Sequence, residues 1–155
     1  HGAIFRIELP LDKTVPETES ARERAPAAAS SPPSRRILLV EDHEQTRSTL
    51  AQLLQRRGHF VECAATLEAA RELAGAGDHD LIISDLGLPD GDGHTLMADL
   101  HDNRGLPGIA LTGYGTEHDI ARSRASGFFA HLTKPIDIQV LESAIAAAPH
   151  PVLTR

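Results

Sequence analysis

From position 36 onward, short apolar runs alternate with longer helical patterns, and this alternation restricts the possible folds more than any other feature of the chain. The apolar runs are ILLV, HFVECAA, LIIS, GIALT and FFAHLT, at residues 37–40, 59–65, 81–84, 108–112 and 128–133. The helical patterns follow them at residues 46–57, 66–76, 94–103, 116–126 and 137–148. Runs that are largely apolar are typical of strands buried on both faces of a parallel sheet. We therefore predict an α/β fold, a doubly wound five-stranded parallel sheet with helices on both faces.

The composition agrees with this fold class and excludes some functions. Hydrophobic residues make up 41% of the chain but aromatic residues only 3%, so the core must consist mainly of Leu, Ile, Val and Ala. The formal net charge is -7, and no dense cluster of Lys and Arg interrupts the acidic background. This argues against nucleic-acid binding, because phosphate contacts need clustered basic side chains. The single cysteine, Cys63, excludes an internal disulfide and fits a reducing compartment.

The residues before the alternating region have a different character. Residues 4–10, IFRIELP, alternate apolar and charged side chains, which is typical of a half-buried strand. Residues 12–35 are rich in Pro, Ala, Ser, Glu and Arg and predict a flexible linker. The main domain is therefore expected at residues 36–149, with a short tail at 150–155.

Nothing in the sequence predicts a membrane span or a signal peptide. The chain begins at His1 without an initiator Met, which suggests a piece of a longer protein. We expect a cytoplasmic location for this piece, with any membrane anchor lying elsewhere in the parent protein.

Charged and hydroxyl side chains stand where the predicted strands end. Glu41 and Asp42 follow the first strand, Asp85 the third, Thr112 closes the fourth, and Lys134 follows the fifth. In a doubly wound parallel sheet, the carboxyl ends of the strands form one ligand-binding edge. Three carboxylates that meet there would repel one another, and a buried carboxylate is costly unless it is paired or bound to metal. Ligands that are all oxygen favour Mg²⁺ over Zn²⁺, so we expect a magnesium site.

An acid pair, an Asp, a Thr and a Lys-Pro at successive strand ends together resemble the response-regulator receiver domain, over about residues 36–148. The segments SDLGLPDGDGHTL, ALTGYG and HLTKP are similar in particular to receivers fused to hybrid histidine kinases. The resemblance implies the flavodoxin-like receiver fold. It also implies that Asp85 accepts a phosphoryl group from a phosphohistidine, while the hydroxyl of Thr112 and the ammonium of Lys134 contact the phosphoryl oxygens.

The resemblance also implies how the metal is held. Asp42 would bind Mg²⁺ directly and Glu41 mostly through water. Asp85 and the backbone carbonyl of Gly87 would complete the protein ligands.

A conformational switch is implied as well. Thr112 would move toward the phosphoryl group, and a residue three positions before the lysine would respond. Receivers usually place an aromatic side chain at that position, whereas this chain has His131. The bond between Lys134 and Pro135 is a candidate cis peptide, since X-Pro bonds adopt this form far more readily than others.

The first eleven residues, HGAIFRIELPL at 1–11, resemble the C-terminal end of a histidine kinase ATP-binding domain. With the linker and receiver that follow, they imply a hybrid sensor histidine kinase as the parent. The expected partners are the phosphohistidine domain of the same parent chain and a histidine phosphotransfer protein or another response regulator, without nucleic acid or direct membrane contact. The piece lacks a kinase catalytic core, so we expect it only to assist phosphorylation of its own Asp85.

Two other functions remain open. A phosphatase with an aspartyl nucleophile would need a second acid two residues beyond Asp85, where this chain has Gly87. A receiver-like module that binds partners without being phosphorylated typically lacks one of the acids or the lysine, all of which are present here.

Two further patterns have simple explanations. The run DGDG at residues 90–93 lacks the later glutamate of a calcium-binding EF-hand loop, whose last position would fall on His101, so it indicates a tight turn. The nine histidines are scattered along the chain, and we expect most of them at the surface.

Overall fold

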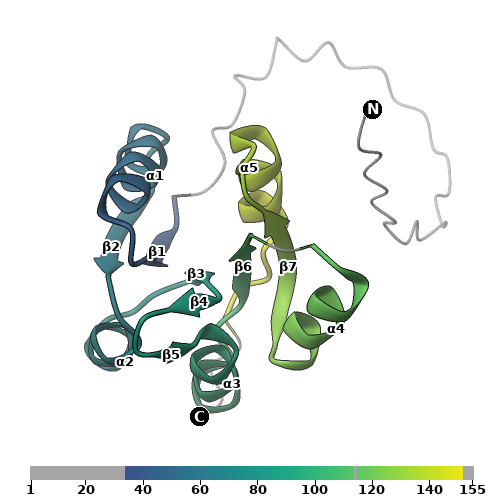
Figure 1. Cartoon of the computed structure of the whole chain (residues 1–155). Helices are drawn as coiled ribbons and strands as arrows, with labels where there is room; N and C mark the ends of the chain where they lie inside the picture. Colours follow the sequence, from purple (N-terminus) through teal and green to yellow (C-terminus); the bar gives the residue numbers. More distant parts are fainter. Residues whose placement is uncertain (1–33, 114, 152–155) are drawn as a thin grey trace, which may run out of the picture. The chain divides into compact units, whose positions relative to one another are not determined.

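The computed structural model describes residues 34–113 and 115–151, so the predictions for residues 1–11 and for most of the linker lie outside the described residues. Five parallel strands form the main sheet in the order β2-β1-β3-β6-β7 (Figure 1). Their bounds are β1 Arg36–Val40, β2 Phe60–Ala64, β3 Leu81–Asp85, β6 Gly108–Thr112 and β7 Phe128–Thr133. Counted within this sheet alone, the order is 2-1-3-4-5, that of the flavodoxin-like fold. The predicted fold class is confirmed.

Helices cover both faces of the sheet. They are α1 Glu44–Arg56, α2 Leu67–Ala76, α3 Gly93–Arg104, α4 Glu117–Ala125 and α5 Ile138–Ala147. Successive side chains of a strand point to opposite faces, so Ile37 and Leu39 pack with α1 and α5, while Leu38 and Val40 pack with α2 and α3. The sheet thus lies between two hydrophobic clusters. This explains why apolar and polar residues do not alternate along the sequences of these strands.

A small antiparallel pair of strands lies between β3 and α3, where the sequence predicts only a tight turn. These strands are β4 Gly87–Leu88 and β5 Gly91–Asp92. Asp90 accepts hydrogen bonds from the backbone N–H groups of Leu67 (2.9 Å) and Glu68 (3.1 Å) at the start of α2. The bond from Leu67 is the main reason that the pKa of Asp90 lies below its ordinary value. Asp92 accepts from the N–H of His94 (2.9 Å), so both aspartates of the DGDG run cap helices.

The start of α3 lies against the end of β3. A Cβ atom on Gly93 would stand 2.5 Å from the carbonyl oxygen of Asp85, which leaves no room for a side chain. The N–H of Gly93 donates to the carbonyl of Leu86 at 3.0 Å. This close approach links the position of α3 to the strand end that carries Asp85.

The two described residues before β1 contact the rest of the folded unit. Ser34 and Arg35, which the sequence analysis assigns to the linker, both bind to it. The hydroxyl of Ser34 donates to the carbonyl of Gly58, and the buried guanidinium of Arg35 donates to the carbonyls of Ala148 (2.6 Å) and Pro149 (3.3 Å) after α5.

Among the described helices, none combines the length and apolar character that a membrane span requires.

Candidate functional site

Three carboxylates meet at the carboxyl edge of the sheet. Asp85 is the last residue of β3, while Glu41 and Asp42 follow the adjacent strand β1. The two strands are in parallel register, so their ends lie side by side. Each of these residues offers a carboxylate oxygen, and these oxygens lie within 4.8 Å of one another. Glu41 is 1% exposed and Asp85 is 9% exposed, whereas Asp42 faces solvent.

The ammonium group of Lys134 lies among these acids. Its Nζ atom donates to Oδ2 of Asp85 at 2.7 Å and to Oε2 of Glu41 at 2.8 Å. Burial opposes the charge of this ammonium, but the hydrogen bonds to Asp85 and Glu41 outweigh burial and raise the pKa of Lys134 above its ordinary value. One ammonium neutralises only one of three carboxylates. The remaining negative charge and the all-oxygen donor set fit a hard divalent cation such as Mg²⁺.

The backbone around Lys134 binds to the neighbouring strand end. The N–H of Lys134 donates to the carbonyl of Thr112 at 2.7 Å, and the bond between Lys134 and Pro135 is cis. Thr112 is buried at the end of β6, the strand that lies between β3 and β7. It therefore stands between the strand that carries Asp85 and the strand that leads to Lys134. The fold brings together the acids and the amine that the sequence analysis places at strand ends, and it places Thr112 at the end of the neighbouring strand.

Gly87 is the second residue after Asp85 and begins β4. Its N–H donates to Oδ1 of Asp85 at 3.2 Å, so the loop after β3 folds back onto the acidic side chain. The two oxygens of Asp85 thus have different partners, an amide at Oδ1 and the ammonium of Lys134 at Oδ2.

Arg47 is a site residue that the sequence analysis missed. Its guanidinium donates to the backbone carbonyls of Glu41 (2.7 Å) and Asp42 (3.0 Å), while Oε1 of Glu41 accepts from the N–H of His43 at 3.2 Å. Arg47 lies in the first turn of α1 and fixes the loop that carries the acid pair. A basic residue one turn into the helix that follows an acid pair is the signal that could have identified it.

His131, the expected switch residue, is half-buried on β7. Its Nδ1 atom lies 3.0 Å from the hydroxyl oxygen of Ser123 in α4. The position three residues before Lys134 is therefore connected to α4.

Three histidines do not lie at the surface, where the sequence analysis expects most of them. His59, His79 and His94 are buried, and each has a polar partner that reduces the cost of burial. Nδ1 of His59 accepts from the N–H of Arg35, while the rings of His79 and His94 bind the carboxylates of Glu62 and Asp92, respectively. Burial, followed by the positive charges of Arg35 and Arg57, lowers the pKa of His59.

The chain is similar to known proteins of one family. Residues 37–146 match the model of the response regulator receiver domain family. The KDP operon transcriptional regulatory protein KdpE of Escherichia coli is 36% identical over 112 residues, which cover 72% of this chain and 50% of that protein. The sensor kinase CckA of Brucella abortus is 30% identical over 157 residues, covering 93% of this chain and 16% of that protein.

A solved structure is similar in both fold and sequence. It is a response regulator protein from Burkholderia pseudomallei with a phosphorylated aspartic acid, calcium ion and citrate. The TM-score is 0.68 at 31% identity, and the match covers 72% of this chain and 66% of that one.

Proposed function

Since this chain belongs to the response regulator receiver domain family, we propose that Asp85 accepts a phosphoryl group from a phosphohistidine in a two-component phosphorelay. The observation that carries the proposal is the environment of the Asp85 carboxylate. It ends a central strand, contacts the ammonium of Lys134 at 2.7 Å, and lies with Glu41 and Asp42 in one acidic cluster. The phosphorylated aspartic acid of the Burkholderia pseudomallei relative supports the same chemistry.

Transfer requires little covalent help from the protein. A carboxylate oxygen of Asp85 forms a bond to phosphorus as the bond from phosphorus to the imidazole nitrogen of the donor breaks. Lys134, already beside this carboxylate, offers positive charge to the phosphoryl oxygens, and the hydroxyl of Thr112 is proposed to donate to one of them. Mg²⁺ bound by Glu41, Asp42, Asp85 and the carbonyl of Gly87 would supply further positive charge.

The residue two positions after Asp85 argues against a phosphatase. A second acid there would protonate a leaving group, but Gly87 has no side chain to do so. The phosphoaspartate is then an intermediate that signals until it is transferred or hydrolysed. This favours a signalling role over turnover of a phosphorylated substrate.

We also propose that the parent protein is a hybrid sensor histidine kinase. The similarity to the sensor kinase CckA supports this origin, since it extends over 93% of the chain and so beyond residues 37–146. The proposed partners are the phosphohistidine domain of the parent and a histidine phosphotransfer protein or another response regulator.

The proposal is tested by intact-mass measurement after incubation with a phosphohistidine donor and Mg²⁺. We expect one phosphoryl adduct on the wild-type chain, and none with Asp85→Asn or after chelation of Mg²⁺. Asp102→Asn is the matched control, because Asp102 is an exposed acid on α3 away from the acidic cluster.

The outcomes separate two functions. An adduct that survives in Asp85→Asn would assign the acceptor elsewhere. The absence of an adduct with a donor that phosphorylates another receiver would contradict phosphotransfer and favour a module that binds partners without phosphorylation.

A further inference from the structure

The proposed protein ligands of the cation come from two segments of the chain. Glu41 and Asp42 lie in the loop between β1 and α1, which we name the first ligand loop. Asp85 and Gly87 lie where β3 leads into the second ligand loop, residues 86–92 before α3. A cation binds more tightly when its ligands are already held in place, because ordering a loose loop costs conformational entropy. The contacts that hold the two loops should therefore contribute to the affinity for the cation.

Arg47 binds three successive carbonyls of the first ligand loop. Its Nη1 atom donates to the carbonyls of Glu41 at 2.7 Å and Asp42 at 3.0 Å. Its backbone N–H donates to the carbonyl of His43 at 2.9 Å. On the other side of the loop, the N–H of Glu41 donates to the carbonyl of Ala64 on β2 at 3.1 Å. The backbone that carries both carboxylates is therefore held between a strand and a helix.

These contacts stand in for a helix cap. His43 is the N-cap residue of α1, and its side chain makes no capping hydrogen bond. A side-chain acceptor at this position normally fixes how the chain enters a helix. Here the half-buried Arg47 fixes the entry from within the helix, by binding the carbonyls that precede it.

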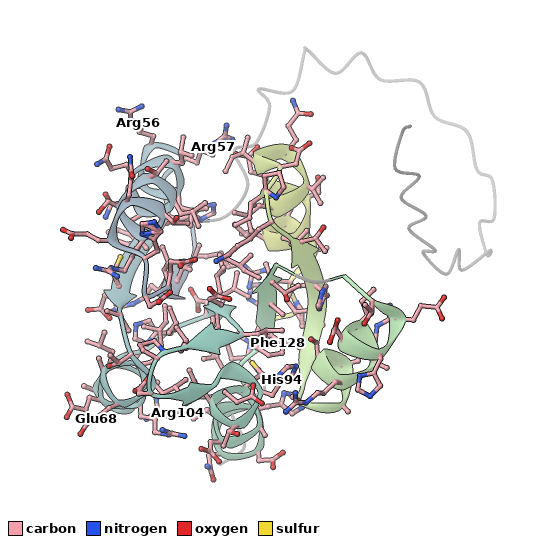
Figure 2. The ribbon with its side chains drawn as sticks, viewed as in Figure 1. Arg56, Arg57, Glu68, His94, Arg104 and Phe128 are labelled. Atoms are coloured by element: carbon pink, nitrogen blue, oxygen red, sulfur yellow. The ribbon has the colours of Figure 1, made fainter. Side chains whose placement is uncertain are left out.

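Asp90 holds the second ligand loop in a corresponding way. Its Oδ1 and Oδ2 atoms accept from the N–H groups of Leu67 at 2.9 Å and Glu68 at 3.1 Å, respectively. These are the first two residues of α2, where Figure 2 labels Glu68. The positive end of the helix dipole favours a carboxylate there. A Cβ atom on Gly91 would stand 2.8 Å from Cδ1 of Leu67, so the loop lies directly on α2.

The position of Asp90 in the loop connects it to Gly87. The pairing of β4 with β5 places Gly87 opposite Asp92 and Leu88 opposite Gly91, so Asp90 lies in the turn between these two strands. The contact with α2 therefore holds the tip of the hairpin that begins at Gly87. A hairpin held at its tip has less freedom to move the carbonyl of Gly87 away from Asp85.

We propose that Arg47 and Asp90 are positioning residues of the cation site, each of which holds one ligand loop against a helix and so raises the affinity for Mg²⁺. The inference rests on the proposed function, which places Mg²⁺ at Asp85. Neither residue belongs to the acidic cluster, so both act through the backbone that carries the ligands.

The charge of Arg47 makes the proposal sharp. A guanidinium near a cation repels it, so charge alone predicts that the loss of Arg47 would tighten Mg²⁺ binding. Positioning predicts the opposite change. The direction of the effect therefore separates the two explanations.

The first test is a titration of Arg47→Met with Mg²⁺, followed by ¹H–¹⁵N NMR at the amide of Gly87. We expect binding to weaken roughly tenfold, as is usual when a residue that orients metal ligands is lost. Arg47→Lys keeps a charged donor and should recover part of the affinity. Arg56→Met is the matched control, because Arg56 is exposed in the last turn of α1 (Figure 2). It should leave the affinity within about twofold of the wild-type value.

The second test applies the same titration to Asp90, whose contacts are exposed, and it guards against misfolding of the Arg47 variants. We expect Asp90→Ala to weaken Mg²⁺ binding about threefold, since exposed charged contacts contribute little each. Asp90→Asn loses the charge but keeps an acceptor oxygen, so it should bind more tightly than Asp90→Ala. Asp102→Ala removes an exposed charge from α3 and should match the wild-type protein.

The outcomes distinguish this inference from the proposed function. Unchanged or tighter binding of Mg²⁺ by folded Arg47→Met would overturn the role of Arg47, and equal affinities of Asp90→Ala and Asp90→Asn would overturn that of Asp90. Both results would leave the function of Asp85 intact. An amide of Gly87 that does not respond to Mg²⁺ in the wild-type protein would contradict the cation site, and the positioning roles with it. A wild-type protein that binds Mg²⁺ but takes no phosphoryl group would contradict the proposed function alone.

Discussion

At the scale of single residues, the stability of the acidic site depends on the positive charge beside its carboxylates. Glu41 and Asp85 are buried carboxylates that share one ammonium, that of Lys134. Buried acids of this kind are tolerated only when they are paired. Lys134 therefore has a structural role in the free protein as well as a proposed role in phosphoryl transfer.

Replacing Lys134 by glutamine should expose this dual role. We expect Lys134→Gln to lower the free energy of unfolding by about 1.5–3 kcal/mol in the presence of a chelator, because two charged hydrogen bonds are lost. Mg²⁺ should restore more stability to Lys134→Gln than to the wild-type chain, because the ammonium and the cation use the same carboxylates. Urea denaturation with and without Mg²⁺ measures both effects. Equal stabilisation of the two proteins by Mg²⁺ would show that the cation binds elsewhere.

The main residues of the site could be predicted from the sequence because one rule locates them. The carboxyl ends of parallel strands share an edge, so acids, a threonine and a lysine at strand ends must meet. Arg47 could not be predicted by this rule, because it lies within a helix and not at a strand end. Its role depends on the loop carbonyls that its guanidinium reaches, and only its place one turn into the helix after the acid pair indicates it.

At the scale of elements, β3 and α3 approach each other closely beside the site. A Cβ on Gly93 would lie 2.5 Å from the carbonyl oxygen of Asp85, whereas a Cβ on Gly87 would meet nothing within 4 Å. Gly87 begins the small β4–β5 pair, and Gly93 directly follows it. Their substitution by alanine therefore compares a crowded position with an open one in the same loop region.

We expect Gly93→Ala to lower the free energy of unfolding by about 1–3 kcal/mol, the usual cost of forcing an extra methyl group into a packed region. Gly87→Ala should change stability by less than about 0.5 kcal/mol, as is usual for exposed substitutions, and should keep its backbone carbonyl. Thermal or urea denaturation of both variants checks the difference. Similar stabilities would mean that α3 shifts readily, contrary to the close approach seen here.

The strands and helices of the main sheet were predictable because each is long enough to show its pattern. The strands at 108–112 and 128–133 agree with the sequence analysis residue for residue, and no helix end differs from it by more than two residues. The β4–β5 pair was missed because strands of two residues carry no periodicity. The burial of Ser123 in α4 was missed for a related reason, since helical periodicity reveals apolar faces and not buried hydroxyls.

At the scale of the whole molecule, the segment just before β1 binds the segment that follows α5. Arg35 precedes β1, yet its guanidinium binds the carbonyls of Ala148 and Pro149 after α5. These carbonyls lie at the C-terminal end of a helix, where positive charge is favourable. Arg35 is buried, whereas its neighbour Arg36 is exposed.

Arg35→Ala should therefore lower the free energy of unfolding by about 1–3 kcal/mol, because buried carbonyl acceptors lose a charged donor. Arg36→Ala, the matched control, should stay within about 0.5 kcal/mol of the wild-type value. Chemical denaturation monitored by far-ultraviolet circular dichroism measures both. A small effect of Arg35→Ala would indicate that the end of α5 is held by its apolar contacts alone.

The measurement that tests the central claim most directly is the chemical location of the phosphoryl group. Borohydride reduces an acyl phosphate to an alcohol, so a phosphorylated aspartate becomes homoserine and can be found by peptide mapping. After incubation with a phosphohistidine donor and Mg²⁺, we expect homoserine at position 85 alone. Homoserine at another aspartate, or none in a chain that carries the adduct, would contradict the assignment of Asp85 as the acceptor.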